Sequence, residues 1–327
     1  MKELELDRVI HLAHSYQEPR VLLTASELGL FSILRERSMT AEGIAQSRGW
    51  DPQALQVLLD ALAVMGFLEK TLNRYSIAQV NRDLLSPDDD RGVIAMVRHA
   101  ATAWPSWSGL TARIAANGAL PNIDASQEFV ASMHAIAEKL APGIAALIRP
   151  EMGRSFLDVG GGSGAYTIAF LARNRSLRAS LLDRPEILEH TQGYLAQADC
   201  SDCVQLVKGD ATCDEWPGDQ DLVFLSALIH SQSPAGCDNI YRRAFRSLAP
   251  GGRVVVRDHV MSENRLRPRA GTLFNVHMLV CTADGRTYTF SEIRRGMDAA
   301  GFVDVRLVQD GERMNGLVEA FKPTGVE

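Results

Sequence analysis

The sequence predicts an α/β protein in which an all-helical or winged-helix N-terminal domain precedes a mostly parallel sheet with a terminal antiparallel hairpin. Beyond residue 150, short apolar segments alternate with helical ones, which indicates parallel strands with helices on both faces. Gly160, Gly161, Gly162 and Gly164 separate the first of these strands from a helix. Before residue 80, two helical segments are followed by a short hairpin.

The length of the chain indicates more than one domain. Its 327 residues exceed the usual size of a single hydrophobic core. Polar residues at 82–90 and a break at 150–155 mark the boundaries. We therefore expect a winged-helix domain over residues 1–90, a helical linker over 91–150 and the α/β domain over 151–327.

Helical spacing and capping residues place the N-terminal elements. Apolar residues recur with helical spacing over 15–34, and Thr40 is a suitable N-cap for the next helix. Asp51 and Pro52 begin a further helix that ends at Gly66. Two short strands then follow, at 67–70 and 74–77.

The α/β region begins with a buried strand at 155–159 and a helix at 165–173. The sequence predicts further strands at 179–182, 204–207, 222–225 and 253–256, helices at 185–196 and 237–248, and a final hairpin of strands at 303–309 and 316–321.

Charge and composition exclude several classes of function. A net charge of −6 disfavours binding to nucleic acid. No apolar run is long enough to span a membrane, and an acidic beginning argues against a secretory signal, so a cytoplasmic protein is expected. Five cysteines favour free thiols over a disulfide framework. Cys200 and Cys203 lack the second pair that a metal site would need.

The glycine-rich loop marks a ligand site, because ligands of open α/β sheets bind beyond the carboxyl ends of the strands. The loop alone does not identify the ligand. Gly160, Gly162 and Ala165 also satisfy the dinucleotide pattern G-x-G-x-x-A, and Asp183 follows at the distance of a ribose-binding carboxylate.

Three features favour S-adenosylmethionine over a dinucleotide. Asp158 precedes the first glycine, where a carboxylate suits the ammonium of a methionine moiety and has no use beside a pyrophosphate. Asp210 follows another strand, where it could contact adenine or ribose. The terminal antiparallel hairpin is typical of methyltransferase sheets.

Several motifs resemble those of one family. Leu157 to Gly164, Leu182 to Pro185 and Gly209-Asp210 are similar to the cofactor motifs of the plant caffeic-acid type of O-methyltransferase and its bacterial relatives. The resemblance covers nearly the whole chain. It implies a Rossmann-like methyltransferase sheet and a homodimer formed through the N-terminal winged helix.

The resemblance also implies a set of cofactor-binding residues. They are Asp158, Gly160, Gly162, Asp183, Asp210, Ala211 and Ser226. The family has a lysine near the adenine at the position of Ser226, so this contact departs from the pattern.

The predicted catalytic pair is His230 and Asp258. Methyl transfer from a sulfonium usually requires a base to deprotonate the acceptor, and histidine is the most frequent base. His230 ends the strand-like run 222–229 and, by the resemblance, matches the general base of the motif H-D-W. Asp258 closes the strand at 253–257 and matches a family glutamate. It could fix the imidazole tautomer.

Two positions depart from the family around this pair. Ser231 and Gln232 replace the Asp and Trp of the motif, and Thr287 stands where the family has a second bracketing glutamate. We therefore expect a weaker base, an acceptor that is already acidic, or a carbon or nitrogen nucleophile.

Register within the resemblance predicts the residues that line the site of a small-molecule acceptor, namely Phe129, Met133, Asn275 and Met278. Packing between domains is an equally good interpretation of Phe129. Trp104 and Trp107 could flank an aromatic acceptor. His277 and His230 could together ligate a metal, but no carboxylate pattern supports this, so no metal is predicted.

Two rival functions remain as alternatives to methyl transfer. A winged-helix regulator is disfavoured, because residues 51–66 contain no Lys or Arg to contact DNA. The other rival binds S-adenosylmethionine for non-methylating chemistry, such as hydroxylation or decarboxylation. The changed surroundings of His230 keep this alternative open.

Overall fold

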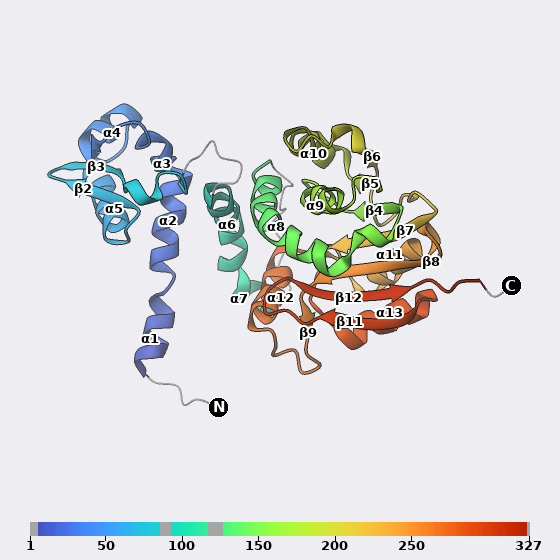
Figure 1. Cartoon of the computed structure of the whole chain (residues 1–327). Helices are drawn as coiled ribbons and strands as arrows, with labels where there is room; N and C mark the ends of the chain where they lie inside the picture. The colour runs from blue at the N-terminus through green and yellow to red at the C-terminus, as the bar shows by residue number, and fades with distance from the viewer. Residues whose placement is uncertain (1–5, 86–92, 117–126, 326–327) are drawn as a thin grey trace. The chain divides into compact units, whose positions relative to one another are not determined.

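The computed structural model describes residues 6–85, 93–116 and 127–325. Contacts within the chain divide it into two compact units, Met1–Trp104 and Pro105–Glu327. The division falls inside α6 (Val93–Ser108), so the predicted linker over 91–150 contributes to both units. Figure 1 shows the elements of both units, coloured from blue at the N-terminus to red at the C-terminus.

Unit 1 has the predicted order of two helical segments and a hairpin. Its main elements are α1 (Leu6–His14), α2 (Gln17–Glu27), α3 (Leu30–Ile33), β1 (Met39–Thr40), α4 (Ala41–Arg48), α5 (Pro52–Val64), β2 (Leu68–Thr71) and β3 (Arg74–Ile77). The Thr40 hydroxyl accepts a hydrogen bond from Gly43 N at 3.0 Å and so caps α4. The expected helix over 15–34 is interrupted, because Gly29 takes a left-handed φ of +66° between α2 and α3.

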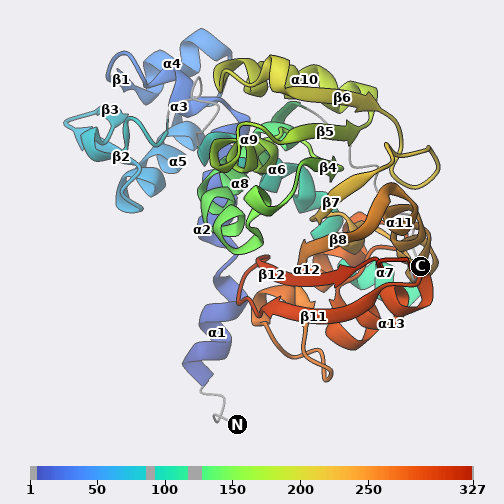
Figure 2. The same ribbon diagram turned by 45° about the vertical axis from the view of Figure 1, so that its right-hand side comes forward.

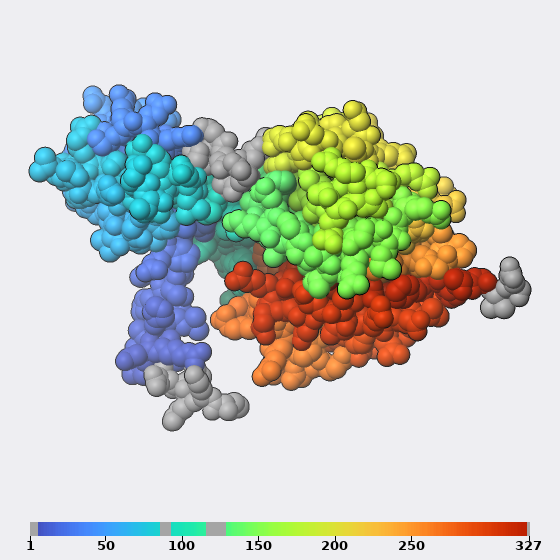
Figure 3. Space-filling view, in the orientation of Figure 1, coloured from blue at the N-terminus to red at the C-terminus, as the bar shows by residue number. Residues whose placement is uncertain are grey.

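Apolar residues of unit 1 divide into a core and an exposed face. Leu55, Leu59 and Leu62 of α5 are buried in the core of this unit. In contrast, α1 has no buried residue, although it carries Leu6 and Leu12, which are 73% and 68% exposed. Figure 3 shows α1 standing out from the rest of its unit. This face is available to another protein surface.

Unit 2 contains a seven-stranded sheet of order β11-β12-β8-β7-β4-β5-β6 (Figure 2). Its strands are β4 (Ser155–Val159), β5 (Arg178–Asp183), β6 (Val204–Lys208), β7 (Gln220–Ser226), β8 (Leu248–Asp258), β11 (Val303–Gln309) and β12 (Gly316–Phe321). The five adjacent strands β6, β5, β4, β7 and β8 are parallel to one another. β12 and β11 complete the sheet with antiparallel pairs. The predicted sheet and terminal hairpin are therefore confirmed.

Helices cover both faces of this sheet. The helices of unit 2 beyond α6 are α7 (Leu110–Ala116), α8 (Gln127–Ile148), α9 (Ala165–Arg173), α10 (Pro185–Gln197), α11 (Pro234–Ser247), α12 (Arg269–Cys281) and α13 (Phe290–Ala300). Residues of α8, α9 and α10 share one buried cluster with one face, and residues of α11 and α13 share another cluster with the opposite face. The chain fills the sheet outward from β4 to β6 and returns through β7 on the other side of β4. The carboxyl ends of β4 and its neighbours thus form the switch point at which such sheets bind ligands.

The chain between β7 and His230 differs from the sequence expectation. The strand-like run over 222–229 leaves the sheet at Ser226, where β7 ends. Ala227 has a φ of +53°, and its N–H donates to Arg257 O at 2.9 Å, which turns the chain away from the sheet. His230 therefore lies on a 3₁₀ turn, η4 (Ile229–Ser231), rather than at the end of a strand.

Candidate cofactor and catalytic site

The glycine loop after β4 needs its glycines for conformation and for space. Gly160, Gly162 and Gly164 have φ values of +68°, +56° and +78°, which side-chain-bearing residues rarely adopt. A Cβ on Gly161 would lie 2.5 Å from Leu181 Cγ and 3.0 Å from Asp158 Cγ. The loop is therefore folded tightly over the end of the sheet. Its four glycines carry no side chain, and the Ser163 side chain is buried against His134.

Asp158 is buried beneath this loop with one oxygen unused. Its Oδ2 accepts a hydrogen bond from Thr167 Oγ1 at 2.7 Å, whereas its Oδ1 has no partner among the residues described. Burial, together with the charge of Asp183, raises the pKa of Asp158 to about 7, against a smaller opposing effect of the Thr167 hydrogen bond. An orphaned acceptor at this place suits a cationic donor.

The raised pKa of Asp158 predicts how stability depends on pH. The folded state keeps this proton up to about pH 7, whereas the unfolded chain loses it near its ordinary pKa of 3.8. Between these values the folded state binds more protons, so the free energy of unfolding falls as pH rises. Asp158→Asn removes this titration. We therefore expect the free energy of unfolding of the variant, measured relative to that of the wild type, to increase by about 2 to 3 kcal/mol between pH 5 and pH 8. Urea unfolding of both ligand-free proteins at the two pH values measures the difference; an equal difference at both would contradict the prediction.

Two further carboxylates stand at the ends of the neighbouring strands. Asp183 ends β5 and accepts hydrogen bonds from Gly162 N and Arg184 N, both at 2.8 Å. Burial raises the pKa of Asp183, and these two N–H groups partly offset the rise. Asp210, just beyond β6, accepts hydrogen bonds from the Thr212 hydroxyl at 2.6 Å and its N–H at 2.7 Å, which lower the pKa of Asp210.

The predicted cofactor residues therefore lie along one edge of the sheet. Asp158 and the glycines follow β4, Asp183 ends β5, Asp210 and Ala211 follow β6, and Ser226 ends β7. These four strands are parallel neighbours, and their carboxyl ends meet at the switch point. At Ser226 the hydroxyl accepts a hydrogen bond from Arg257 Nη1 at 3.0 Å, a contact that the sequence did not suggest.

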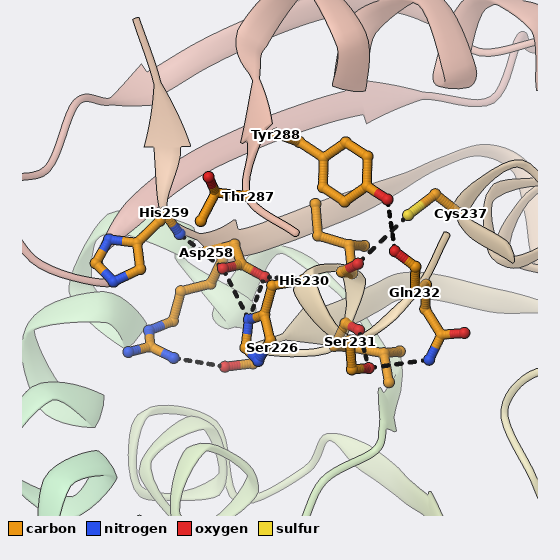
Figure 4. A network of polar contacts seen from close by, with 12 residues as sticks. Ser226, His230, Ser231, Gln232, Cys237, Asp258, His259, Thr287 and Tyr288 are labelled. Carbon is orange, nitrogen blue, oxygen red and sulfur yellow. Dashed lines mark hydrogen bonds and ion pairs between the residues drawn. The ribbon is translucent and has the colours of Figure 1, made fainter. Parts of the chain in front are cut away.

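His230 and Asp258 are in direct contact (Figure 4). His230 Nδ1 lies 2.9 Å from both carboxylate oxygens of Asp258. The carboxylate also accepts hydrogen bonds from His230 N at 3.3 Å and His259 N at 2.7 Å. Burial alone would raise the pKa of Asp258, but His230 and the backbone N–H of His259 outweigh it, so this pKa lies below its ordinary value.

This contact fixes the tautomer of the imidazole. An ionised carboxylate can only accept hydrogen bonds, so Nδ1 of His230 must carry the proton that it donates to Asp258. In the neutral ring the lone pair is then on Nε2, which makes no hydrogen bond to any residue in the described ranges. The side chain of His230 remains 12% exposed. The ring is therefore oriented with a basic nitrogen available to a ligand.

The turn that carries His230 is held by a segment far away in the sequence. Arg286 N donates a hydrogen bond to His230 O at 2.8 Å, and Tyr288 Oη donates one to Gln232 O at 2.6 Å. The edge of the His230 ring meets Phe274 of α12, with ring centroids 4.9 Å apart. Thr287 is 2% exposed, and within the described part of the chain Asp258 is the only carboxylate hydrogen-bonded to His230.

The predicted acceptor residues occupy two helices of unit 2. Phe129 and Met133 are half-buried on α8, whereas Asn275 and Met278 are on α12. Asn275 Oδ1 accepts a hydrogen bond from Thr287 N at 2.8 Å. This bond joins α12 to the segment 286–288 that holds the His230 turn. Their contact with an acceptor stays a prediction.

Of the two tryptophans, Trp107 contacts His277. Trp107 Nε1 donates to His277 Nδ1 at 3.1 Å, whereas Trp104 is the last residue of unit 1.

Across the residues that the structure describes, no group of three or more His, Cys, Asp or Glu side chains is arranged to hold a metal ion. None of the helices in those ranges combines the length and apolar character needed to cross a bilayer.

Curated relatives cover nearly the whole chain. A polyketide 8-O-methyl transferase of tetracenomycin synthesis from Streptomyces glaucescens is 25% identical over 91% of this chain and 91% of its own. A 3-hydroxy-5-methyl-1-naphthoate 3-O-methyltransferase from Streptomyces sahachiroi is 26% identical over 95% of this chain and 94% of its own. The solved structure of PigF with SAH has the same fold, with a TM-score of 0.84, 23% identity and coverage of 98% of this chain and all of that one.

Family models match both parts of the chain. One describes an O-methyltransferase dimerisation domain and matches residues 10–87. The other describes an O-methyltransferase domain and matches residues 127–303, more than half of the chain. The chain therefore belongs to the O-methyltransferase family, whose members are S-adenosylmethionine-dependent methyltransferases.

Proposed function

We propose that this methyltransferase transfers a methyl group to a hydroxyl oxygen of a small aromatic or polyketide-like metabolite, with His230 as general base. The observation that carries the proposal is the 2.9 Å contact between His230 Nδ1 and Asp258, which leaves Nε2 as the basic nitrogen. The relatives named above support the acceptor class, because one serves polyketide synthesis and the other methylates a hydroxylated naphthoate.

The residues at the switch point fit S-adenosylmethionine. The glycines of the loop present backbone without side chains, and the orphaned Oδ1 of Asp158 can accept a hydrogen bond from an ammonium group. Asp183 and Asp210 stand at successive strand ends, where they can hold the hydroxyls of the ribose and the adenine. When bound, S-adenosylmethionine supplies an electrophilic methyl group on its sulfonium.

His230 removes the acceptor proton in this proposal. Its Nε2 takes the proton of the acceptor hydroxyl, and the ring becomes an imidazolium. Asp258 acts as a positioning residue, since its carboxylate holds Nδ1–H and stabilises the positive charge that forms. The buried carboxylate cannot turn away from the ring, because the N–H groups of His230 and His259 also hold it.

The single carboxylate partner narrows the class of acceptor. Thr287 cannot supply the second negative charge that would strengthen the base. An acceptor whose hydroxyl is already acidic needs less help from His230. We therefore favour phenols that lie beside a carbonyl group.

A homodimer in the cytoplasm completes the proposal. The match to a dimerisation domain begins at residue 10, within α1, and the apolar side chains of α1 are exposed in the single chain. Burying such a face against a second copy is the simplest way to remove it from water. All five cysteines are free thiols, which suits a reducing compartment.

Asp258→Asn tests the positioning role. An amide can donate to Nδ1, which would move the ring proton to Nε2 and abolish the basic lone pair. We expect kcat to fall by about a hundredfold at pH 7.5, with the dissociation constant of SAH unchanged. Asp258→Glu, which keeps the charge, should recover at least about a tenth of the wild-type kcat. If Asp258→Asn and Asp258→Glu have equal activity, the carboxylate does not position the base.

Methyl transfer itself is tested with labelled S-adenosylmethionine and a library of phenols, with and without an adjacent carbonyl. Release of SAH identifies an acceptor, and mass spectrometry with NMR shows whether oxygen, carbon or nitrogen carries the new methyl group. A methyl ether is the expected product. Tight cofactor binding with no SAH from any acceptor would support the non-methylating alternative and reject the proposal.

A further inference from the structure

Arg257 is a buried charge at the ligand edge of the sheet. It is the penultimate residue of β8 and is only 4% exposed. Val255, two residues earlier, and Leu317, its cross-strand partner on β12, are buried and apolar and share its face of the sheet. Charged side chains are seldom buried this fully unless they are paired.

The contacts of Arg257 leave most of its guanidinium unused. Nη1 donates to Ser226 Oγ at 3.0 Å, and Cζ lies 5.0 Å from the centre of the Tyr166 ring. Nε is buried and has no hydrogen-bond partner, and no carboxylate of the described residues forms an ion pair with the group. Burial lowers the pKa of Arg257, although interactions with Tyr166 and Asp258 oppose the change.

Another arginine on the same strand shows how the fold pairs such a charge. Arg253 lies four residues earlier on the same face, and its Nη1 is 3.3 Å from a carboxylate oxygen of Glu319. Its Nη2 also donates to the carbonyls of Ile148 and Arg149. Arg253, in the middle of β8, therefore has a carboxylate partner from the protein, and Arg257, near the carboxyl end of the strand, has none among the described residues.

Tyr166 adds a second unpaired donor at the same place. It lies in the first turn of α9, directly after the glycine loop, and is 6% exposed. Its hydroxyl is buried without a hydrogen-bond partner among the described residues. Tyr166 therefore belongs to the helix that follows the glycine loop, Arg257 precedes Asp258, the partner of His230, and the guanidinium lies against the Tyr166 ring.

We propose that Arg257, assisted by Tyr166, binds a carboxylate of a ligand at this edge of the sheet. A guanidinium with free N–H groups matches a carboxylate in shape and charge. The carboxylate can come from the methionine end of the cofactor or from an acidic acceptor, and in both cases the inference rests on the proposed function. It requires no chemistry from His230, so binding alone tests it.

Calorimetry with matched ligands separates the two sources. The first pair is SAH and its decarboxylated analogue, 5′-(3-aminopropylthio)-5′-deoxyadenosine. The second pair, titrated into SAH-saturated protein, is 2-hydroxybenzoate and its neutral amide. We expect the wild type to prefer the carboxylate of one pair by at least about tenfold, and Arg257→Met to lose that preference. The pair affected identifies the source, and Tyr166→Phe should reduce the same preference.

Arg306→Met is the matched control, because Arg306 lies on the same sheet but pairs with Glu319 and is largely exposed. It should keep the wild-type preference. The proposal is overturned if Arg257→Met keeps the preference, or if the wild type shows none in either pair. Should Arg257→Met fail to fold, Arg257→Lys replaces it: a preference reduced at least threefold supports the proposal, and an unchanged one overturns it. These binding measurements do not depend on turnover. They can therefore support or overturn the carboxylate site whether or not the protein methylates a hydroxyl oxygen.

Discussion

His230→Ala is expected to lower kcat by at least about a hundredfold at neutral pH, the usual scale for loss of a general base. In the proposed mechanism, the substitution removes the nitrogen that takes the acceptor proton. It leaves the glycine loop and the carboxylates at the ends of β4, β5 and β6 in place, because His230 lies on a turn outside the sheet. We therefore expect the dissociation constant of SAH to stay within about twofold of the wild type.

The pH profile makes this test specific to a base. A phenol that ionises in solution no longer needs a base, so the activity of His230→Ala should rise with pH toward the pKa of the acceptor hydroxyl and narrow the gap to the wild type. SAH release under saturating acceptor, measured from pH 6 to pH 10, gives the profile. His190→Ala, on the surface helix α10, serves as the control and should behave as the wild type. Turnover of His230→Ala near the wild-type level at pH 7 would remove His230 from the mechanism.

Gly161→Ala is expected to have the largest effect on cofactor binding. The added Cβ would lie 2.5 Å from Leu181 Cγ, which is branched and fully buried, so neither side chain nor loop can give way cheaply. Overpacking of this kind costs about 1 to 3 kcal/mol of folding stability. The loop must also move off the end of β4, so we expect SAH affinity to fall by at least about a hundredfold, an effect of roughly 2.7 kcal/mol.

Gly193→Ala is the matched control for this substitution. Gly193 lies within α10, and a Cβ there would meet no atom within 4 Å. Alanine in a helix interior is favoured over glycine by about 0.5 to 1 kcal/mol, so this variant should unfold at a slightly higher temperature. Calorimetric titration with SAH and thermal unfolding compare the two variants. If Gly161→Ala binds SAH as tightly as Gly193→Ala does, the loop does not hold the cofactor closely.

The strands and helices near the glycine loop could be predicted because strong local signals bound them. β4 and α9 have the bounds that the sequence predicts, since an apolar strand ends at glycines with positive φ and a helix begins directly after them. By contrast, α13 was not predicted, although Thr289 and Glu292 form a capping box at its start. That motif was present in the sequence and was overlooked.

The candidate site shows where sequence reasoning stops. The contact of His230 with Asp258 could be expected, because His230 follows β7 and Asp258 ends β8, the parallel neighbour of β7. The turn that carries His230 could not, since it depends on a positive φ at Ala227, a residue without special preference for it. Arg257 was missed for another reason. A charged residue after Val254-Val255-Val256 is visible in the sequence, but its lack of a carboxylate partner is a property of the folded chain.

The His230 turn is anchored to Arg286 and Tyr288. The orientation of the imidazole is thereby separated from the proposed binding of the cofactor. In the proposed site the cofactor is held at the strand ends, whereas the direction of the imidazole depends on a segment 56 residues further along the chain. We therefore expect insertions or substitutions over 282–288 to redirect the proposed base toward acceptors of a different shape and to leave the proposed cofactor site intact. For directed evolution, this segment is a place to alter acceptor choice without rebuilding the catalyst.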